Sequence, residues 1–152
     1  MMTPTANGPE ATPRLCCADR VMPLPLAPLA PGVRAKPNTE RRLQRDLRTL
    51  VKFVDTYCSE KHRLRQRVVM KGIDVGEIAG KHLFLCAECT KLLQHALVKR
   101  THCPRDPKPE CKHCPTHCYA PKYREEIREV MKFSGRYLVM RGRLHYLWHL
   151  FF

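Results

Sequence analysis

The sequence lacks any long hydrophobic run: none of its 152 residues lies in a stretch of eighteen apolar residues, so we expect no membrane-spanning helix. A secretory signal is also missing, because the apolar stretch VMPLPLAPLAPG carries four prolines that prevent a helical core. No nucleophile elbow, glycine-rich phosphate loop or HExxH motif is present. We therefore expect a cytoplasmic protein with reduced thiols, and none of these classical catalytic motifs supports an enzyme.

Aromatic residues are scarce at 7%, whereas positive charge is plentiful: 28 Lys and Arg against 14 Asp and Glu give a formal net charge of +14. Such a surface attracts polyanions, and residues 39–67 carry much of this charge on a predicted helix. With few aromatic side chains to stack on bases, any binding of nucleic acid would be mainly electrostatic. A solvated basic surface without a partner is the alternative.

Nine cysteines are present, an odd number that fits poorly with a fully paired set of disulfides. In a reducing cytoplasm, a chain this rich in cysteine is typical of metal or thiol chemistry. Cys16 and Cys17 are adjacent in a proline-rich segment, and we assign them no role.

The chain divides into a proline-rich tail at 1–37, which we expect to be disordered, and a cysteine-rich helical domain at 38–152. Helical periodicity predicts a helix over 39–62, with Cys58 on its buried face. Further helices are predicted from about Glu88 to Arg100, over 121–135 with Gly135 as its stop, and over 143–151. Residues 63–82 have no clear period, and we expect an irregular segment with a short strand at 67–70.

The fold class predicted from this pattern is mostly α, a small helical domain with an irregular Cys/Pro-rich metal-binding loop. The five prolines between residues 104 and 121 argue against regular structure in that loop.

Six cysteines are concentrated in 33 residues, and two pairs of them have the C-x2-C spacing of a metal chelate. We expect the two pairs to close around one soft metal, either zinc or an iron–sulfur cluster, since four thiolates suit both. The predicted metal ligands are Cys86, Cys89, Cys103, Cys111, Cys114 and Cys118, with Cys58 and His117 as possible additional ligands.

Two other interpretations of these residues remain. A thiol oxidoreductase would need its C-x2-C between a strand and a helix in a β-α-β context, and that pattern is not visible around Cys86. His145 and His149 have a chelating spacing, but no cysteine or carboxylate is near them in sequence, which favours an ordinary polar helix face.

The combined pattern resembles the nitrous-oxide-stimulated promoter family of small bacterial proteins. The resemblance rests on YC at 57–58, LCAEC-x2-LL at 85–93, the cysteine at 103, KPECKHCPTHCY-x-P at 108–121 and REEIREVMKFSG at 124–135. It implies a role in the response to nitric oxide or recovery from nitrosative stress. The family cysteines match Cys58 and the six predicted ligands, and a family histidine matches His117.

This sequence departs from the family pattern where Arg136, Tyr137 and Leu138 follow Gly135, in the length of 63–82 and in its proline-rich start. Three functions are therefore predicted as alternatives. The first is a metal-binding stress protein, the second a metal-stabilised nucleic-acid-binding or regulatory module, and the third a C-x2-C thiol oxidoreductase. The sequence leaves the oligomeric state open.

Overall fold

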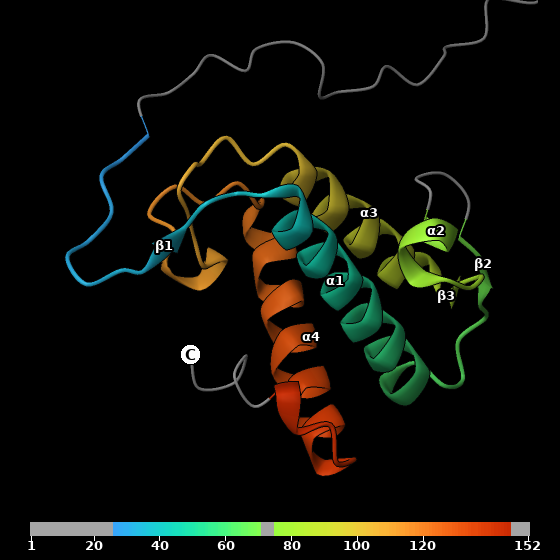
Figure 1. Ribbon diagram of the computed structural model, residues 1–152. Coiled ribbons are helices and arrows are strands. Elements are labelled where there is room, and N and C mark those ends of the chain that lie inside the picture. Colours follow the sequence, from blue (N-terminus) through green and yellow to red (C-terminus); the bar gives the residue numbers. More distant parts are fainter. Residues whose placement is uncertain (1–25, 71–74, 147–152) are drawn as a thin grey trace, which may run out of the picture.

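A computed structural model describes residues 26–70 and 75–146 of the chain. Three long helices dominate it: α1 (Glu40–Lys61), α3 (Ala87–Thr101) and α4 (Pro121–Met140). Helices α3 and α4 both pack against α1, which runs through the middle of the domain (Figure 1). The mostly α fold class is confirmed, and no helix in these residues has the length and apolar character needed to cross a membrane.

Helix α1 confirms the helix predicted over 39–62. The Thr39 hydroxyl caps its start by accepting a hydrogen bond from the backbone N–H of Arg42 at 3.4 Å. One face of the helix is buried from Leu47 to Cys58, since apolar residues recur there every three or four positions. The buried members are Leu47, Leu50, Val51, Phe53, Val54, Thr56 and Cys58.

Helix α3 supplies the second half of the core and also confirms its prediction. Cys86 occupies the N-cap position, and Lys99 and Arg100 lie in the last turn, where positive charge is favourable. The buried face of α3 contains Cys89, Leu92, Leu93, Ala96, Leu97 and Arg100.

Helix α4 begins at Pro121, as expected, but the predicted stop at Gly135 is wrong. The helix continues to Met140, because Ser134, Gly135 and Leu138 are all buried against the rest of the domain. The Ser134 hydroxyl donates a hydrogen bond to the Phe53 carbonyl of α1 at 2.7 Å. The residue that follows the helix in a left-handed conformation is Gly142, with φ of 79°.

Two small antiparallel ladders join segments that are distant in sequence. Strand β1 (Ala35–Lys36) pairs with β4 (Lys108–Pro109), and β2 (Val68–Val69) pairs with β3 (Phe84–Leu85). The strand predicted within 67–70 is therefore present. The short helix α2 (Val75–Ala79) lies between β2 and β3, where sequence periodicity gave no helix.

Three expectations about loops and ends need correction. The proline-studded loop contains β4 and a single 3-10 turn, η1 (Cys111–His113), because Pro109 lies in a two-residue edge strand that tolerates proline. Residues 144–146 form another 3-10 turn, η2 (Leu144–Tyr146); the rest of the predicted last helix lies outside the described residues. Strand β1 also falls within the segment 1–37 for which we expect disorder, and it is paired with β4. Residues 1–25 of the predicted tail, including Cys16 and Cys17, are outside the described residues.

Candidate metal centre

Three cysteines and one histidine converge where the end of α1 meets the beginning of α3. Their ligand atoms all lie within 4.8 Å of one another, and they come from Cys58, His62, Cys86 and Cys89. The three cysteines are buried and His62 is half-buried. A group of three thiols and one imidazole is a known ligand set for structural zinc, so these four residues can hold a metal ion.

Local structure explains why the four side chains meet. Cys58 and His62 are four residues apart at the C-terminal end of α1, so both lie on the same face of the helix. Cys86 is the N-cap of α3 and Cys89 lies in its first turn, where the C-x2-C spacing brings both sulfurs to one side. Strand β3 ends at Leu85, directly before the pair, and its ladder with β2 fixes the approach of the chain.

The distances between donor atoms are those of a small coordination sphere. His62 Nδ1 lies 3.2 Å from Cys89 Sγ and 3.4 Å from Cys86 Sγ. In a tetrahedral zinc site with bonds of about 2.0–2.3 Å, neighbouring ligand atoms are separated by about 3.5–3.8 Å. The cluster is therefore close to the geometry of a single four-coordinate ion.

Backbone amides help to carry the negative charge of the thiolates. The amide of Cys86 donates to Cys58 Sγ at 3.4 Å, and the N-terminus of α3 adds the positive end of its dipole. Burial opposes ionisation of Cys86, yet hydrogen bonds from the Cys89 amide and from neighbouring side chains lower the pKa of its thiol overall. Burial raises the pKa of both Cys58 and Cys89. Metal binding must therefore displace protons from these two buried thiols.

The imidazole of His62 is held in the form that binds metals. Burial, followed by the positive charge of Arg65, lowers the pKa of His62, so the neutral ring is favoured near neutral pH. The ring of Tyr57 packs edge-on against it, with centroids 5.2 Å apart, and the Tyr57 hydroxyl donates to Glu129 of α4 at 2.6 Å. These contacts restrict the orientation of the imidazole.

Two arginines place positive charge around the thiols. Arg67 donates to the carbonyls of Cys58 and Ser59 at 3.2 and 3.4 Å and so caps the end of α1. Arg65 pairs with Glu88 in the first turn of α3. Both arginines oppose the negative charge that three thiolates would concentrate here.

The structure brings only part of the predicted ligand set to this centre. Cys58, Cys86 and Cys89 meet there, whereas Cys103, Cys111, Cys114 and Cys118 lie beyond the other end of α3. With 15 residues, α3 is about 22 Å long, so the two C-x2-C pairs do not surround one ion. Within residues 26–70 and 75–146, no second group of three or more such side chains is as tightly clustered.

The distal cysteines nevertheless share a region around η1. Although Cys118 as a whole is exposed, partial desolvation of its sulfur raises the pKa of the thiol, and the nearby charges of Cys111 and Cys103 raise it further. Cys111 also receives a contact from Lys108 Nζ at 3.7 Å, while the Cys114 thiol donates to the Thr116 carbonyl at 3.2 Å. Cys111 and Cys118 are exposed.

Of the described histidines discussed so far, His62 lies in the cluster, whereas His117 and His145 lie outside it. His62 is the candidate ligand that sequence reasoning missed, although its i, i+4 spacing from Cys58 on a predicted helix was a usable signal. His117 is exposed in the distal loop, outside the cluster at Cys58. His145 is exposed in η2, and His149 lies outside the described residues.

Two of the comparisons with known proteins give matches, and they agree with the cysteine pattern. Uncharacterized protein YgbA of Escherichia coli strain K12 is 42% identical over 43 residues, which make up 28% of this chain and 37% of that protein. The chain thus matches little more than a third of that relative's length. No solved structure matches. Residues 41–152 match the family described as nitrous oxide-stimulated promoter, and the chain belongs to this family.

Proposed function

We propose that this protein is a cytoplasmic metal-binding protein that acts in the response to nitrosative stress, with a structural zinc ion held by Cys58, His62, Cys86 and Cys89. The observation that carries the proposal is the convergence of the four ligand atoms within 4.8 Å. A site with four protein ligands leaves no open position for a substrate, which favours a structural ion over a catalytic one.

The same distances favour one zinc ion over an iron–sulfur cluster. A cluster binds its cysteines through different iron atoms, so its thiolates are spread around a larger inorganic core. Donor atoms only 3.2 and 3.4 Å apart leave room for one ion between them. Three thiolates and a neutral imidazole are also a ligand set that zinc readily takes.

For Cys103, Cys111, Cys114 and Cys118, we propose a second, more labile metal position in the distal loop. The proximity of Cys103 and Cys111 to Cys118, whose pKa their charges help to raise, supports it, as does the C-x2-C spacing of Cys111 and Cys114. The loop would have to tighten on binding, because its thiols do not form a tight cluster in this structure.

The two sets of cysteines differ in their exposure to solvent, and this difference indicates how the protein would respond to stress. Cys58, Cys86 and Cys89 are buried, whereas Cys111 and Cys118 are exposed and are the thiols that a reagent in solution meets first. Nitric oxide and oxygen form dinitrogen trioxide, a nitrosating agent. A thiolate sulfur attacks its nitroso nitrogen, the S–N bond forms as the N–N bond breaks, and nitrite leaves.

Metal counting before and after nitrosation tests this proposal. The intact protein, purified without air, is expected to contain two equivalents of zinc, and a nitrosating reagent should release one rapidly. The C111S/C118S double variant should bind one equivalent and release it slowly. If both proteins contained only one equivalent of zinc, the proposed metal position in the distal loop would be wrong. A brown protein with bound iron and sulfide would show that the assignment of zinc is wrong.

A further inference from the structure

One face of α1 carries a row of basic side chains at helical spacing. Arg41, Arg45, Arg48 and Lys52, named here the basic stripe, are separated by four, three and four residues. At 100° per residue, these spacings keep all four within an arc of about 60° on one side of the helix. The three arginines are exposed and Lys52 is half-buried.

The acidic residues of α1 do not neutralise this stripe. Asp46 pairs with Arg100 at 2.8 Å and Asp55 pairs with Lys81 at 2.8 Å, so both carboxylates already have a cationic partner. Glu40 accepts a hydrogen bond from Gln44 at 2.9 Å. None of the four side chains of the basic stripe has an ion pair with a described residue.

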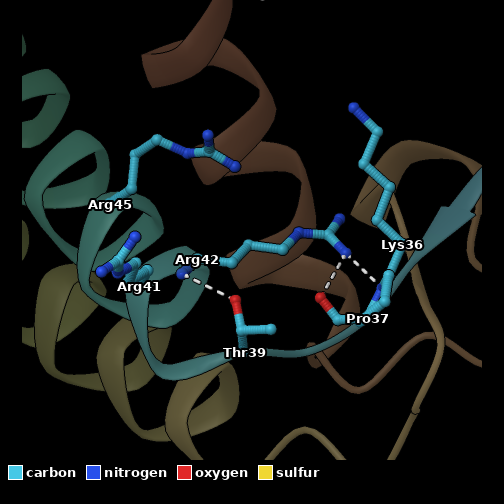
Figure 2. A pocket seen from close by; sticks show the side chains of 6 residues that line it. All are labelled: Lys36, Pro37, Thr39, Arg41, Arg42 and Arg45. Atoms are coloured by element: carbon cyan, nitrogen blue, oxygen red, sulfur yellow. Dashed lines mark hydrogen bonds between the residues drawn. The ribbon is translucent and has the colours of Figure 1, made fainter.

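A hollow adjoins the N-terminal end of the stripe (Figure 2). Its volume is about 270 Å³, and its lining consists of Lys36, Pro37, Thr39, Arg41, Arg42 and Arg45. The guanidinium of Arg42 reaches across to the carbonyls of Lys36 and Lys108 at 2.6 and 3.0 Å, which fixes β1 and β4 beside the helix. Arg42 is thus occupied by the fold, while Lys36, Arg41 and Arg45 are available to an anion.

We propose that the basic stripe binds the phosphate backbone of a nucleic acid duplex. The twelve residues from Arg41 to Lys52 extend over about 16 Å of helix, at about 1.5 Å for each step between neighbours. Over that length of duplex axis each strand carries about five phosphates, which is enough to provide a partner for each side chain of the stripe. Arginine guanidinium groups suit this role because they bind phosphate oxygens with two parallel hydrogen bonds.

The surroundings of the stripe favour a duplex over other polyanions. A helix that binds a membrane surface places large apolar side chains beside its basic ones, whereas none of the exposed large hydrophobic residues among the described positions lies on α1. Single strands are bound by stacking their bases on aromatic side chains, and the stripe contains no aromatic residue. We therefore expect the stripe to contact the phosphate backbone of a duplex without recognising the base sequence.

Binding of a labelled duplex of about 20 base pairs by the zinc-loaded full chain tests the proposal. Fluorescence anisotropy over about 50 to 200 mM salt should give a plot of log K against log salt with a slope of about −3 to −4, since each phosphate contact contributes about −0.9. The R41Q/R45Q/R48Q variant should bind about 100-fold more weakly at 0.1 M salt, and its slope should approach −1.

A matched variant separates the stripe from the net charge. R128Q/K132Q/R136Q removes three exposed charges from α4, where Glu125, Glu126 and Glu129 are interspersed, and it should bind nearly as tightly as the unmodified chain. An equal loss in the two triple variants would overturn the proposal. So would undetectable duplex binding at 50 mM salt, or tighter binding to anionic vesicles than to the duplex. Zinc content is measured on the same samples, so that a loss of duplex binding can be distinguished from a loss of metal.

Discussion

His62 completes the candidate metal centre from the C-cap position of α1, with its Nδ1 atom close to the sulfurs of both Cys86 and Cys89. Burial lowers the pKa of the ring, so that it is ready to bind a metal without first losing a proton. Tyr57, whose ring packs edge-on against the imidazole, is itself hydrogen-bonded to Glu129 of α4. A metal ion bound by His62 would therefore be connected to α1 and α3 directly and to α4 through Tyr57 and Glu129.

Replacing His62 with alanine should remove one ligand and weaken zinc binding by at least about 100-fold, a loss that fits the loss of a direct metal bond. Competition with a chromophoric chelator measures the affinity. The matched control is His102→Ala, because His102 is likewise the histidine at a helix C-cap, at the end of α3, but lies away from the centre. Equal zinc affinity for His62→Ala and the unmodified chain would show that His62 is not a ligand.

The residues of the centre were predictable to different degrees. Cys86 and Cys89 are close in sequence, so their spacing alone indicated a chelate, and the helical periodicity placed Cys58 on a buried face. His62 required combining that helix with the i, i+4 rule. That Cys58 meets the pair at Cys86 depends on how two helices pack, which no local pattern contains.

At the scale of elements, a buried polar network joins the beginning of α1 to the end of α3, at the other end of the helix pair from the candidate metal centre. Arg100 near the end of α3 is only 5% exposed, and it donates to Asp46 at 2.8 Å and to Asn38 at 2.9 Å. Lys108 of β4, also buried, lies 4.0 Å from the same carboxylate. One carboxylate on α1 thus balances two buried cations from other elements.

Asp46→Asn should destabilise the domain by about 2–3 kcal/mol, because it leaves the buried guanidinium and ammonium groups without a negative charge. Chemical denaturation measures this cost. Asp55→Asn is the matched control on the same helix, since its partner Lys81 is largely exposed and the pair should contribute less than about 1 kcal/mol. Similar losses for both variants would contradict the importance of the buried network.

The ends of elements were harder to predict than their existence. Glycine after Ser134 looked like a helix stop, yet burial of Gly135 and Leu138 against the domain extends α4 to Met140. The separation of the two C-x2-C pairs follows from the length of α3, which the sequence predicted correctly. We predicted α3 correctly but still assigned both pairs to one site, because we did not consider how far apart a helix of this length holds them.

At the scale of the whole molecule, the candidate metal centre and the buried polar network lie at the two ends of the contact between α1 and α3. Between them lies a core built from both helices and completed by Val130 and Leu138 of α4. The distal cysteine loop and the start of the basic stripe lie toward the end of the domain opposite the centre (Figure 1). We expect a bound ion to stabilise the helix pair that positions the distal cysteine loop and the basic stripe.

Removing the metal should therefore destabilise the whole domain. A ligand present at about 1,000 times its dissociation constant contributes about 4 kcal/mol, which corresponds to a melting temperature about 20 °C higher in a domain of this size. Thermal unfolding with and without a strong chelator measures the difference, and added zinc should reverse it. An unchanged melting temperature in a protein shown to be free of metal would contradict a structural role.

X-ray absorption at the zinc edge of the C111S/C118S variant tests the central claim most directly, since that variant retains only the centre between α1 and α3. The account predicts one zinc with three sulfur ligands at about 2.3 Å and one nitrogen ligand at about 2.0 Å, and the nitrogen should disappear in the His62→Ala protein. Four sulfur ligands, or a spectrum that does not change when His62 is replaced, would contradict the assignment of Cys58, His62, Cys86 and Cys89 as the metal site.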